Sequence, residues 1–269
     1  MEIEVISNSP DCIKYPTPLL FVHGAWHGAW CWKENFFPYF SAQGFKCYAM
    51  SFRGHGESEG KDQLKRSRLK DYVQDLHQAI EQMETVPIVI GHSLGGFVVQ
   101  KYLEEVQLPK AILLASIAPH GSISPTVRIM LRHPWPFTKI HFSLNLYPLI
   151  SSTRLSHDLL FSDKFPQKKA KEIHKFLQPE SYLAYLDTLF LNLPKASKIG
   201  TEFLVLGAEC DRIIGRKDNE ATARAYDAKL HMIPELAHDM MLDTEWKVAA
   251  DKIIDWLKPQ ASPVSKKPL

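Results

Sequence analysis

One serine of this chain is placed to act as a nucleophile. Ser93 is the centre of Gly-His-Ser-Leu-Gly at positions 91–95, a Gly-x-Ser-x-Gly pattern. The apolar, β-branched residues 88–90 predict a buried strand before it, and apolar residues at helical spacing over 97–103 predict a helix after it. The glycines permit a sharp turn that holds the Ser93 hydroxyl at the start of the helix, where free N–H groups would stabilise an alkoxide. An ordinary turn with a capping serine is the structural alternative.

A serine hydroxyl becomes a strong nucleophile only when a base takes its proton, and histidine is the usual base. His238 is the candidate, because it follows a strand predicted near 229–233 and so reaches the same edge of a parallel sheet as Ser93. Asp211, after the strand predicted at 203–206, opens onto that edge and would fix the tautomer of the imidazole. The order Ser, Asp, His along the chain agrees with this arrangement.

Two other acids lie near these positions. Glu209 is the nearest rival of Asp211 for the role of the triad acid. Asp239 is adjacent to His238 and cannot easily fold back onto its ring, so we expect it to cap the following helix or to face solvent.

Attack on a carbonyl creates an oxyanion, which needs two backbone N–H donors. Leu94, directly after the nucleophile, supplies one, and Ala25, in the glycine-containing loop after a strand predicted at 19–22, supplies the other. One such donor is worth about 3 kcal/mol. We also assign Trp26 and His27 of this loop to substrate binding, with His27 at the mouth of the site.

These residues must be positioned by a parallel sheet. Strands and helices alternate as far as residue 118, which predicts an α/β fold with a mostly parallel central sheet and helices on both faces. About 80 residues then pass before the next strand, more than a crossover needs. We therefore expect a core formed by 1–118 and 197–258, an inserted helical cap at 119–196, and a flexible tail at 259–269.

The expected cap is rich in large apolar side chains. Most of them should pack inside the cap, and a few should face Ser93 to form a pocket that prefers uncharged acyl or alcohol groups. The side chains that we assign to this pocket are Met130, Trp135, Phe142, Phe161 and Phe190.

Composition excludes several classes of partner. A net charge of +2 in 269 residues does not suggest nucleic acid. The four cysteines show no zinc spacing, and no nucleotide-binding motif occurs, so we expect neither a metal nor another cofactor. No apolar run reaches the roughly 18 residues of a membrane helix, and the first residues lack the character of a signal peptide. A cytoplasmic location is therefore expected.

Several motifs in the correct order resemble the α/β-hydrolase fold superfamily. They are His-Gly-Ala-Trp at 23–26, Ser-Phe-Arg-Gly-His-Gly-Glu-Ser at 51–58, Gly-His-Ser-Leu-Gly-Gly at 91–96, Asp211 and His238. The segment 23–30 is similar to the plant methylesterase and hydroxynitrile lyase group, whereas Arg-Gly-His-Gly at 53–56 is similar to many bacterial esterases and lysophospholipase-like proteins. The resemblance implies Ser93, Asp211 and His238 as a triad, and Ala25 and Leu94 as oxyanion donors.

This reading predicts a serine hydrolase that cleaves small-molecule carboxylic esters through an acyl-enzyme. Thioester, amide, lactone and carbon–carbon hydrolysis use the same apparatus. Two alternatives of other classes stay open. One is a lyase that uses His238 and Ser93 as base and proton relay without acylation, and the other is a non-enzymatic small-molecule receptor that retains the triad.

Overall fold

A seven-stranded sheet forms the centre of the protein. The computed structural model describes residues 1–258, and the expected tail at 259–269 lies outside them. The strands are ordered β1-β3-β2-β4-β5-β6-β7, and all neighbouring pairs are parallel except β1 and β3. Their bounds are β1 Val5–Asn8, β2 Tyr15–Val22, β3 Phe45–Met50, β4 Ile88–His92, β5 Lys110–Leu114, β6 Glu202–Ala208 and β7 Lys229–Ile233. The predicted α/β architecture is confirmed.

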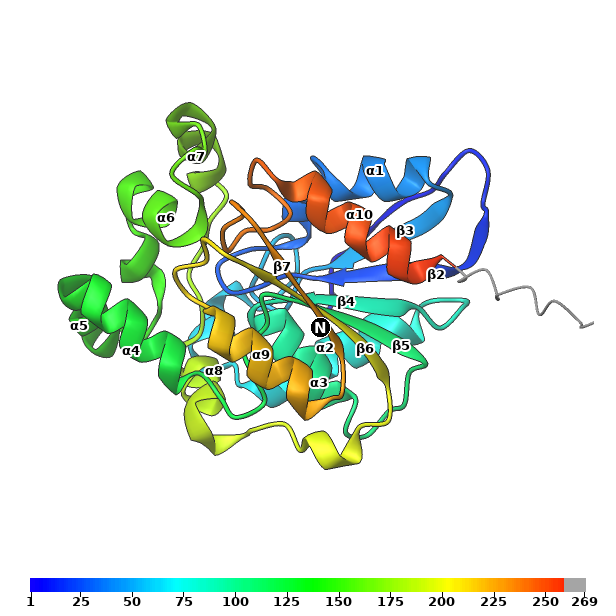
Figure 1. The fold of residues 1–269 in the computed structure, drawn as a ribbon. Helices are drawn as coiled ribbons and strands as arrows, with labels where there is room; N and C mark the ends of the chain where they lie inside the picture. Colours follow the sequence, from blue (N-terminus) through cyan, green and yellow to red (C-terminus); the bar gives the residue numbers. More distant parts are fainter. Residues whose placement is uncertain (259–269) are drawn as a thin grey trace, which may run out of the picture.

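Helices cover both faces of this sheet (Figure 1). Helices α1 and α10 lie together on one face, and α2, α3 and α9 lie on the other. Their bounds are α1 Phe36–Ala42, α2 Leu69–Glu81, α3 Leu94–Tyr102, α9 Arg216–Ala225 and α10 Trp246–Leu257. A strand covered on both faces should be apolar throughout. Residues 19–22 of β2 and 111–114 of β5 meet this requirement, since they are fully buried.

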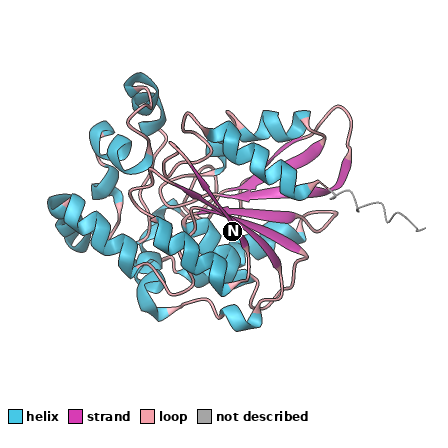
Figure 2. Ribbon diagram, in the orientation of Figure 1, coloured by secondary structure: helices cyan, strands magenta, loops and turns pink. Residues whose placement is uncertain are grey.

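The chain between β5 and β6 is helical (Figure 2). We call residues 119–196 the helical segment, and it lies at one end of the sheet (Figure 1). Its helices are α4 Ile123–Arg132, α5 Pro134–Ser143, α6 Thr153–Leu160, α7 Gln167–His174 and α8 Tyr182–Leu186. It adds no strand to the sheet, and the one backbone bridge inside it joins Asn145 and Ser181. Its helices contact mainly one another, and α8 also contacts α2.

Shorter helical turns complete the described chain. The 3₁₀ turns span Ala29–Trp32, Lys61–Arg66, Tyr147–Ile150 and Ala196–Lys198, and a single π-helical turn spans Asp187–Leu191. Within residues 1–258, no helix is both long and apolar enough to cross a membrane.

The start of α3 packs directly on the end of β2. A Cβ atom added to Gly95 would lie 2.7 Å from the carbonyl oxygen of Val22 and would also collide with the carbonyl oxygen of His23. Both obstacles are backbone atoms of a central strand and its loop, so they cannot rotate away. Glycine at position 95 is therefore required by close approach of two backbones.

We expect Gly95→Ala to destabilise the protein by about 1–3 kcal/mol, the usual cost of overpacking a well-packed core. Urea unfolding followed by circular dichroism measures this difference. Gly200→Ala is the control, because its added Cβ would meet only the Gln107 side chain at 3.4 Å. Equal stability of the two variants would contradict the requirement.

Candidate active site

The turn between β4 and α3 holds Ser93 in a strained conformation. Its backbone angles are φ 52° and ψ −117°, a region that costs a non-glycine residue about 1–3 kcal/mol. Three hydrogen bonds maintain it: the Ser93 N–H donates to the Leu114 carbonyl at 3.0 Å, and the Ser93 carbonyl accepts from Phe97 and Ile117. The strain lifts the Ser93 side chain out of the sheet and towards the helical segment.

Ser93, His238 and Asp211 form one chain of hydrogen bonds. Ser93 Oγ lies 2.9 Å from His238 Nε2, and His238 Nδ1 lies 2.8 Å from Asp211 Oδ2. Because a carboxylate only accepts hydrogen bonds, Nδ1 carries the proton, and Nε2 of the neutral ring is free to accept from Ser93. The other carboxylate oxygen of Asp211 accepts from the N–H groups of Ile213 and Ile214, at 2.7 and 2.9 Å. The structure thus brings the three predicted side chains together.

The two rival acids lie elsewhere. Glu209 is partly exposed and pairs with Arg216, its Oε1 lying 2.6 Å from the guanidinium. Asp239 is fully buried, and its Oδ2 lies 3.0 Å from Nε2 of His27. The expectation that Asp239 caps a helix or faces solvent is wrong, because the loop after β7 turns this side chain into the protein instead of out of it.

Two backbone amides beside Ser93 have no acceptor. In residues 1–258, the N–H groups of Ala25 and Leu94 donate to no protein atom, and both residues line the cavity that contains Ser93. Trp26, next to Ala25, has a left-handed φ of 69°. Its carbonyl accepts from the Gln178 N–H at 3.0 Å, and its indole N–H donates to the Leu146 carbonyl at 3.3 Å. The helical segment therefore helps to hold this strained loop.

Two further buried histidines near Ser93 are neutral. Burial, reinforced by the neighbouring His238, lowers the pKa of His92 to about 3, and His92 Nε2–H donates to the His238 carbonyl at 2.8 Å. Burial also lowers the pKa of His23 well below its usual value. His23 accepts from the Phe52 N–H and donates to the Gly24 carbonyl, so it connects the loop after β2 to the loop after β3.

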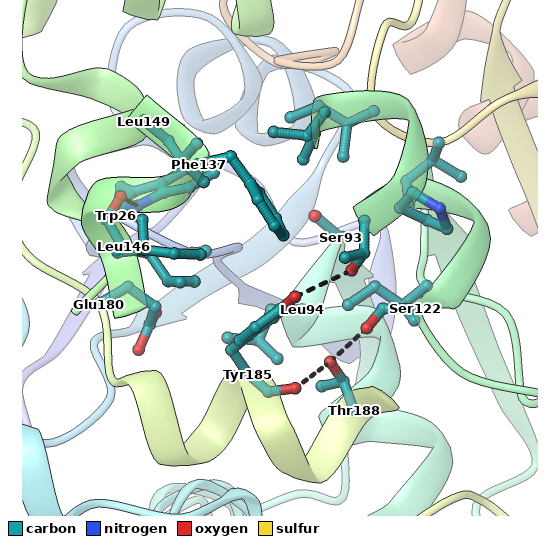
Figure 3. Close-up of a pocket in the computed structure, with 18 residues that line it drawn as sticks. Trp26, Ser93, Leu94, Ser122, Phe137, Leu146, Leu149, Glu180, Tyr185 and Thr188 are labelled. Atoms are coloured by element: carbon teal, nitrogen blue, oxygen red, sulfur yellow. Dashed lines mark hydrogen bonds between the residues drawn. The ribbon is translucent and has the colours of Figure 1, made fainter. Parts of the chain in front are cut away.

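An apolar cavity opens beside Ser93 (Figure 3). The helical segment supplies most of its wall, and residues 213 and 214 of the loop after Asp211 complete it. Its apolar lining residues are Ile117, Pro125, Ile129, Phe137, Ile140, Leu146, Leu149, Ile213 and Ile214. Its hydroxyl groups satisfy one another: Ser122 bonds Thr188 at 2.7 Å, and the Tyr185 hydroxyl donates to Thr126 at 3.3 Å. The free surface of the cavity is therefore almost entirely hydrocarbon.

Of the predicted pocket residues, Trp26 lines this cavity and six others do not. His27 is buried behind the loop against Asp239. Phe161 is packed inside the helical segment, with its ring stacked on that of Phe165 at 4.1 Å. Four side chains lie on the outer surface, with exposed fractions of 38% for Met130, 79% for Trp135, 85% for Phe142 and 65% for Phe190.

The physical reason is helix orientation. Ile129 of α4, and Phe137 and Ile140 of α5, turn towards Ser93, whereas their large neighbours at 130, 135 and 142 turn away. Both sides of these helices are apolar, so side-chain type alone does not distinguish the inner side from the outer. The i, i+3 spacing of Phe137 and Ile140 is a signal that they share one side of α5.

A buried carboxylate that the sequence does not predict, Glu180, lies on the cavity wall. Glu180 Oε1 accepts from the Tyr72 hydroxyl at 2.5 Å and from the Ser181 N–H at 2.6 Å, and Oε2 lies 3.2 Å from Nε2 of His55. Burial first, and then the Glu180 charge, raise the pKa of Tyr72 well above its usual value. No sequence pattern around position 180 predicts this cluster, because Tyr72, Glu180 and His55 come from distant parts of the chain.

The chain is similar to one protein family over most of its length. A model of the alpha/beta hydrolase family matches residues 19–251. The chain belongs to this family. The resemblance seen in its motifs is thus confirmed.

Individual relatives are more distant. A monoacylglycerol lipase of Mycolicibacterium smegmatis is 26% identical over 81% of this chain and 80% of its own length. Methylesterase 3 of Arabidopsis thaliana is 25% identical over 40% of this chain and 42% of its own length, which agrees with the resemblance to plant methylesterases. The solved structure of a bromoperoxidase from Bacillus anthracis superposes with a TM-score of 0.73 at 16% identity, covering 96% of this chain and 95% of that one. That likeness concerns the fold alone.

The described part of the chain contains no evident metal site. Within residues 1–258, no group of three or more His, Cys, Asp or Glu side chains is arranged to hold a metal ion. The expectation that the protein needs no metal or other cofactor stays a prediction.

Proposed function

We propose that this protein is a serine esterase that hydrolyses carboxylic esters of apolar acyl or alcohol groups through an acyl-enzyme. The observation that carries the proposal is the hydrogen-bonded series Ser93–His238–Asp211, which ends in an apolar cavity beside two unpartnered amides. The relative named monoacylglycerol lipase, which aligns with four fifths of the chain, supports an ester as the substrate.

In the first step, Ser93 Oγ attacks the ester carbonyl carbon while its proton passes to His238 Nε2. The Asp211 carboxylate stabilises the resulting imidazolium through Nδ1. The N–H groups of Ala25 and Leu94 bind the oxyanion, and each is worth about 3 kcal/mol in the transition state. Collapse of the tetrahedral intermediate breaks the ester C–O bond, and the alcohol departs with the proton from His238. The acyl group stays on Ser93.

In the second step, water attacks the acyl-enzyme. His238 takes a proton from the water, and a second oxyanion forms in the same place. Its collapse releases the carboxylic acid and returns the proton to Ser93, so the enzyme is regenerated with one water consumed.

The helical segment acts as a cap in this proposal, placed over a core formed by residues 1–118 and 197–258. Its side chains close the cavity over Ser93 and exclude water from the oxyanion, which strengthens the hydrogen bonds there. The substrate is a small molecule and not a nucleic acid, and the reaction takes place in the cytoplasm.

We expect Ser93→Ala to lower the hydrolysis of p-nitrophenyl esters by roughly 10⁵-fold or more, because it removes the attacking atom. Steady-state kinetics measure the loss, and circular dichroism checks the fold. Labelling of the wild-type protein by a fluorophosphonate, absent in the variant, distinguishes an acylating enzyme from a lyase. Tight ligand binding without turnover would instead favour a receptor.

We expect Asp211→Asn to lower kcat by roughly 10⁴-fold, since an amide can hold the wrong tautomer of His238. Glu209→Gln is the matched control, because Glu209 contacts Arg216 on the surface. We expect this variant to keep a kcat near that of the wild type. A greater loss in the Glu209 variant would show that the acid is misassigned.

We expect Phe137→Ala and Ile129→Ala to change the ratio of octanoate to acetate hydrolysis several-fold, because both side chains line the cavity. Trp135→Ala and Phe142→Ala, both on α5, are the controls, since their side chains are exposed. Chain-length profiles of p-nitrophenyl esters, measured beside melting temperatures, give the comparison. If the exposed pair shifts the ratio and the lining pair does not, the substrate is bound elsewhere.

A further inference from the structure

A buried ion pair that the proposed reaction does not use lies directly behind the oxyanion loop. His27 belongs to the loop after β2, and Asp239 follows His238 in the loop after β7. Their side chains are 1% and 0% exposed, and Nε2 of His27 lies 3.0 Å from Oδ2 of Asp239. A buried pair of this kind is costly unless its geometry is well satisfied. The pair joins the loop after β2 to the loop after β7, so it can influence the shape of both.

Both nitrogens of the His27 ring face acceptors. Nδ1 lies 2.7 Å from the carbonyl oxygen of Ala25, and Nε2 lies against the Asp239 carboxylate. A carbonyl and a carboxylate can only accept, whereas a neutral imidazole carries a single N–H. A neutral ring would therefore set a lone pair against one of these oxygens. With Asp239 ionised, as its lowered pKa indicates, both contacts are satisfied together only when His27 is an imidazolium that donates twice.

The charge balance around the pair agrees with this protonation state. Burial favours the neutral ring, but the Asp239 carboxylate outweighs it and raises the pKa of His27. Burial likewise opposes ionisation of Asp239, but His27 overcomes it and lowers the pKa of that carboxyl. The His27 ring also stacks on Trp30, with centroids 5.3 Å apart, which favours a cation.

Few other groups facing the pair carry charge. Glu180, from the helical segment, adds a second favourable carboxylate for His27. His92 and His23 are kept neutral by burial, and burial raises the pKa of the Cys31 thiol well above its usual value. His238 is the remaining titratable neighbour of Asp239. The charge on His27 is thus governed mainly by Asp239.

We propose that His27 and Asp239 are positioning residues, whose ion pair fixes the carbonyl of Ala25 and so keeps the oxyanion loop in its active conformation. The proposal rests on the proposed esterase function. Trp26, the next residue, has the strained φ of 69°, so the loop needs external restraints to keep this shape. The helical segment restrains the Trp26 side, and His27 is the restraint on the Ala25 side.

The proposal predicts an alkaline limit to activity. The folded-state pKa of His27 is raised, so the pair is complete below the usual histidine value and is lost as pH rises through the raised value. The pKa of Asp239 is lowered, so its charge is present above the usual carboxyl value and is lost only as pH falls through the lowered value. Activity should therefore fall at alkaline pH when His27 loses its proton.

Nuclear magnetic resonance of protein with ¹⁵N-labelled histidine tests the protonation state without any reference to activity. At pH 7 we expect protons on both nitrogens of His27, and we expect the same in Ser93→Ala. A neutral His27 ring at this pH would overturn the proposal. Failure of the esterase function would leave this spectrum unchanged, so the two failures are distinguishable.

Substitutions test the role in the reaction. In His27→Asn the amide nitrogen falls near the position of Nδ1 and can still donate to Ala25, whereas in His27→Gln it falls near Nε2 and reaches only Asp239. We expect His27→Gln to lower kcat by about 10²-fold, the cost of misplacing a catalytic group by about 1 Å, with little change in KM. His27→Asn should keep more of kcat and lose the alkaline limit, because the charge that titrates is gone.

Asp239→Asn completes the test. It keeps an acceptor for Nε2 but removes the charge, so the alkaline limit of kcat/KM should move to lower pH. The control His157→Asn removes another buried histidine, which bonds the Phe165 carbonyl at 3.0 Å, and should leave the profile unmoved. Two results would overturn the proposal and leave the pair with a packing role only. One is an Asp239→Asn variant whose alkaline limit of kcat/KM does not move. The other is an equal loss of kcat in the two His27 variants, with the pH profile of the wild type retained.

Discussion

The strained backbone at Ser93 is the constraint on which the rest of the site depends. A serine with φ of 52° is stable only when its neighbours leave no other conformation, and here the end of β5, the first turn of α3 and residue 117 all bond its backbone. The same turn requires glycine at 91 and 95, where backbones approach too closely for a side chain. The close approach of backbones at this turn thus determines the glycines around Ser93, the position of its hydroxyl and the direction of the Leu94 amide.

A second strained residue stands opposite the first. Trp26 has a left-handed φ, and its loop carries the Ala25 amide towards Ser93. Bonds from Gln178 and to Leu146 connect this loop to the helical segment, and His27 connects it to Asp239. The two amides that would hold an oxyanion are thus placed by two strained turns, and each turn is maintained by parts of the chain remote in sequence.

The buried histidines around the site differ in charge. His23 donates one hydrogen bond and accepts another, whereas His92 donates one from Nε2 and its Nδ1 has no partner among the described residues. Burial keeps both rings neutral. His27 has two acceptors and an adjacent carboxylate, which favour the charged ring. Histidines in the same core therefore differ in charge because of their partners, since burial alone would make them all neutral.

The sequence by itself determined the fold class and the three residues of the hydrogen-bonded series. Apolar runs separated by helical patterns specify a parallel sheet, and residues after its strands must meet at one edge, so Ser93, Asp211 and His238 could be predicted to meet. Tertiary structure decided the side-chain environment. Phe137 lines the cavity while Trp135 faces out, and Asp239 pairs with His27 across more than 200 residues of chain. Periodicity reports that a helix is apolar, but only packing against the rest of the protein selects which side faces inward and which buried charges meet.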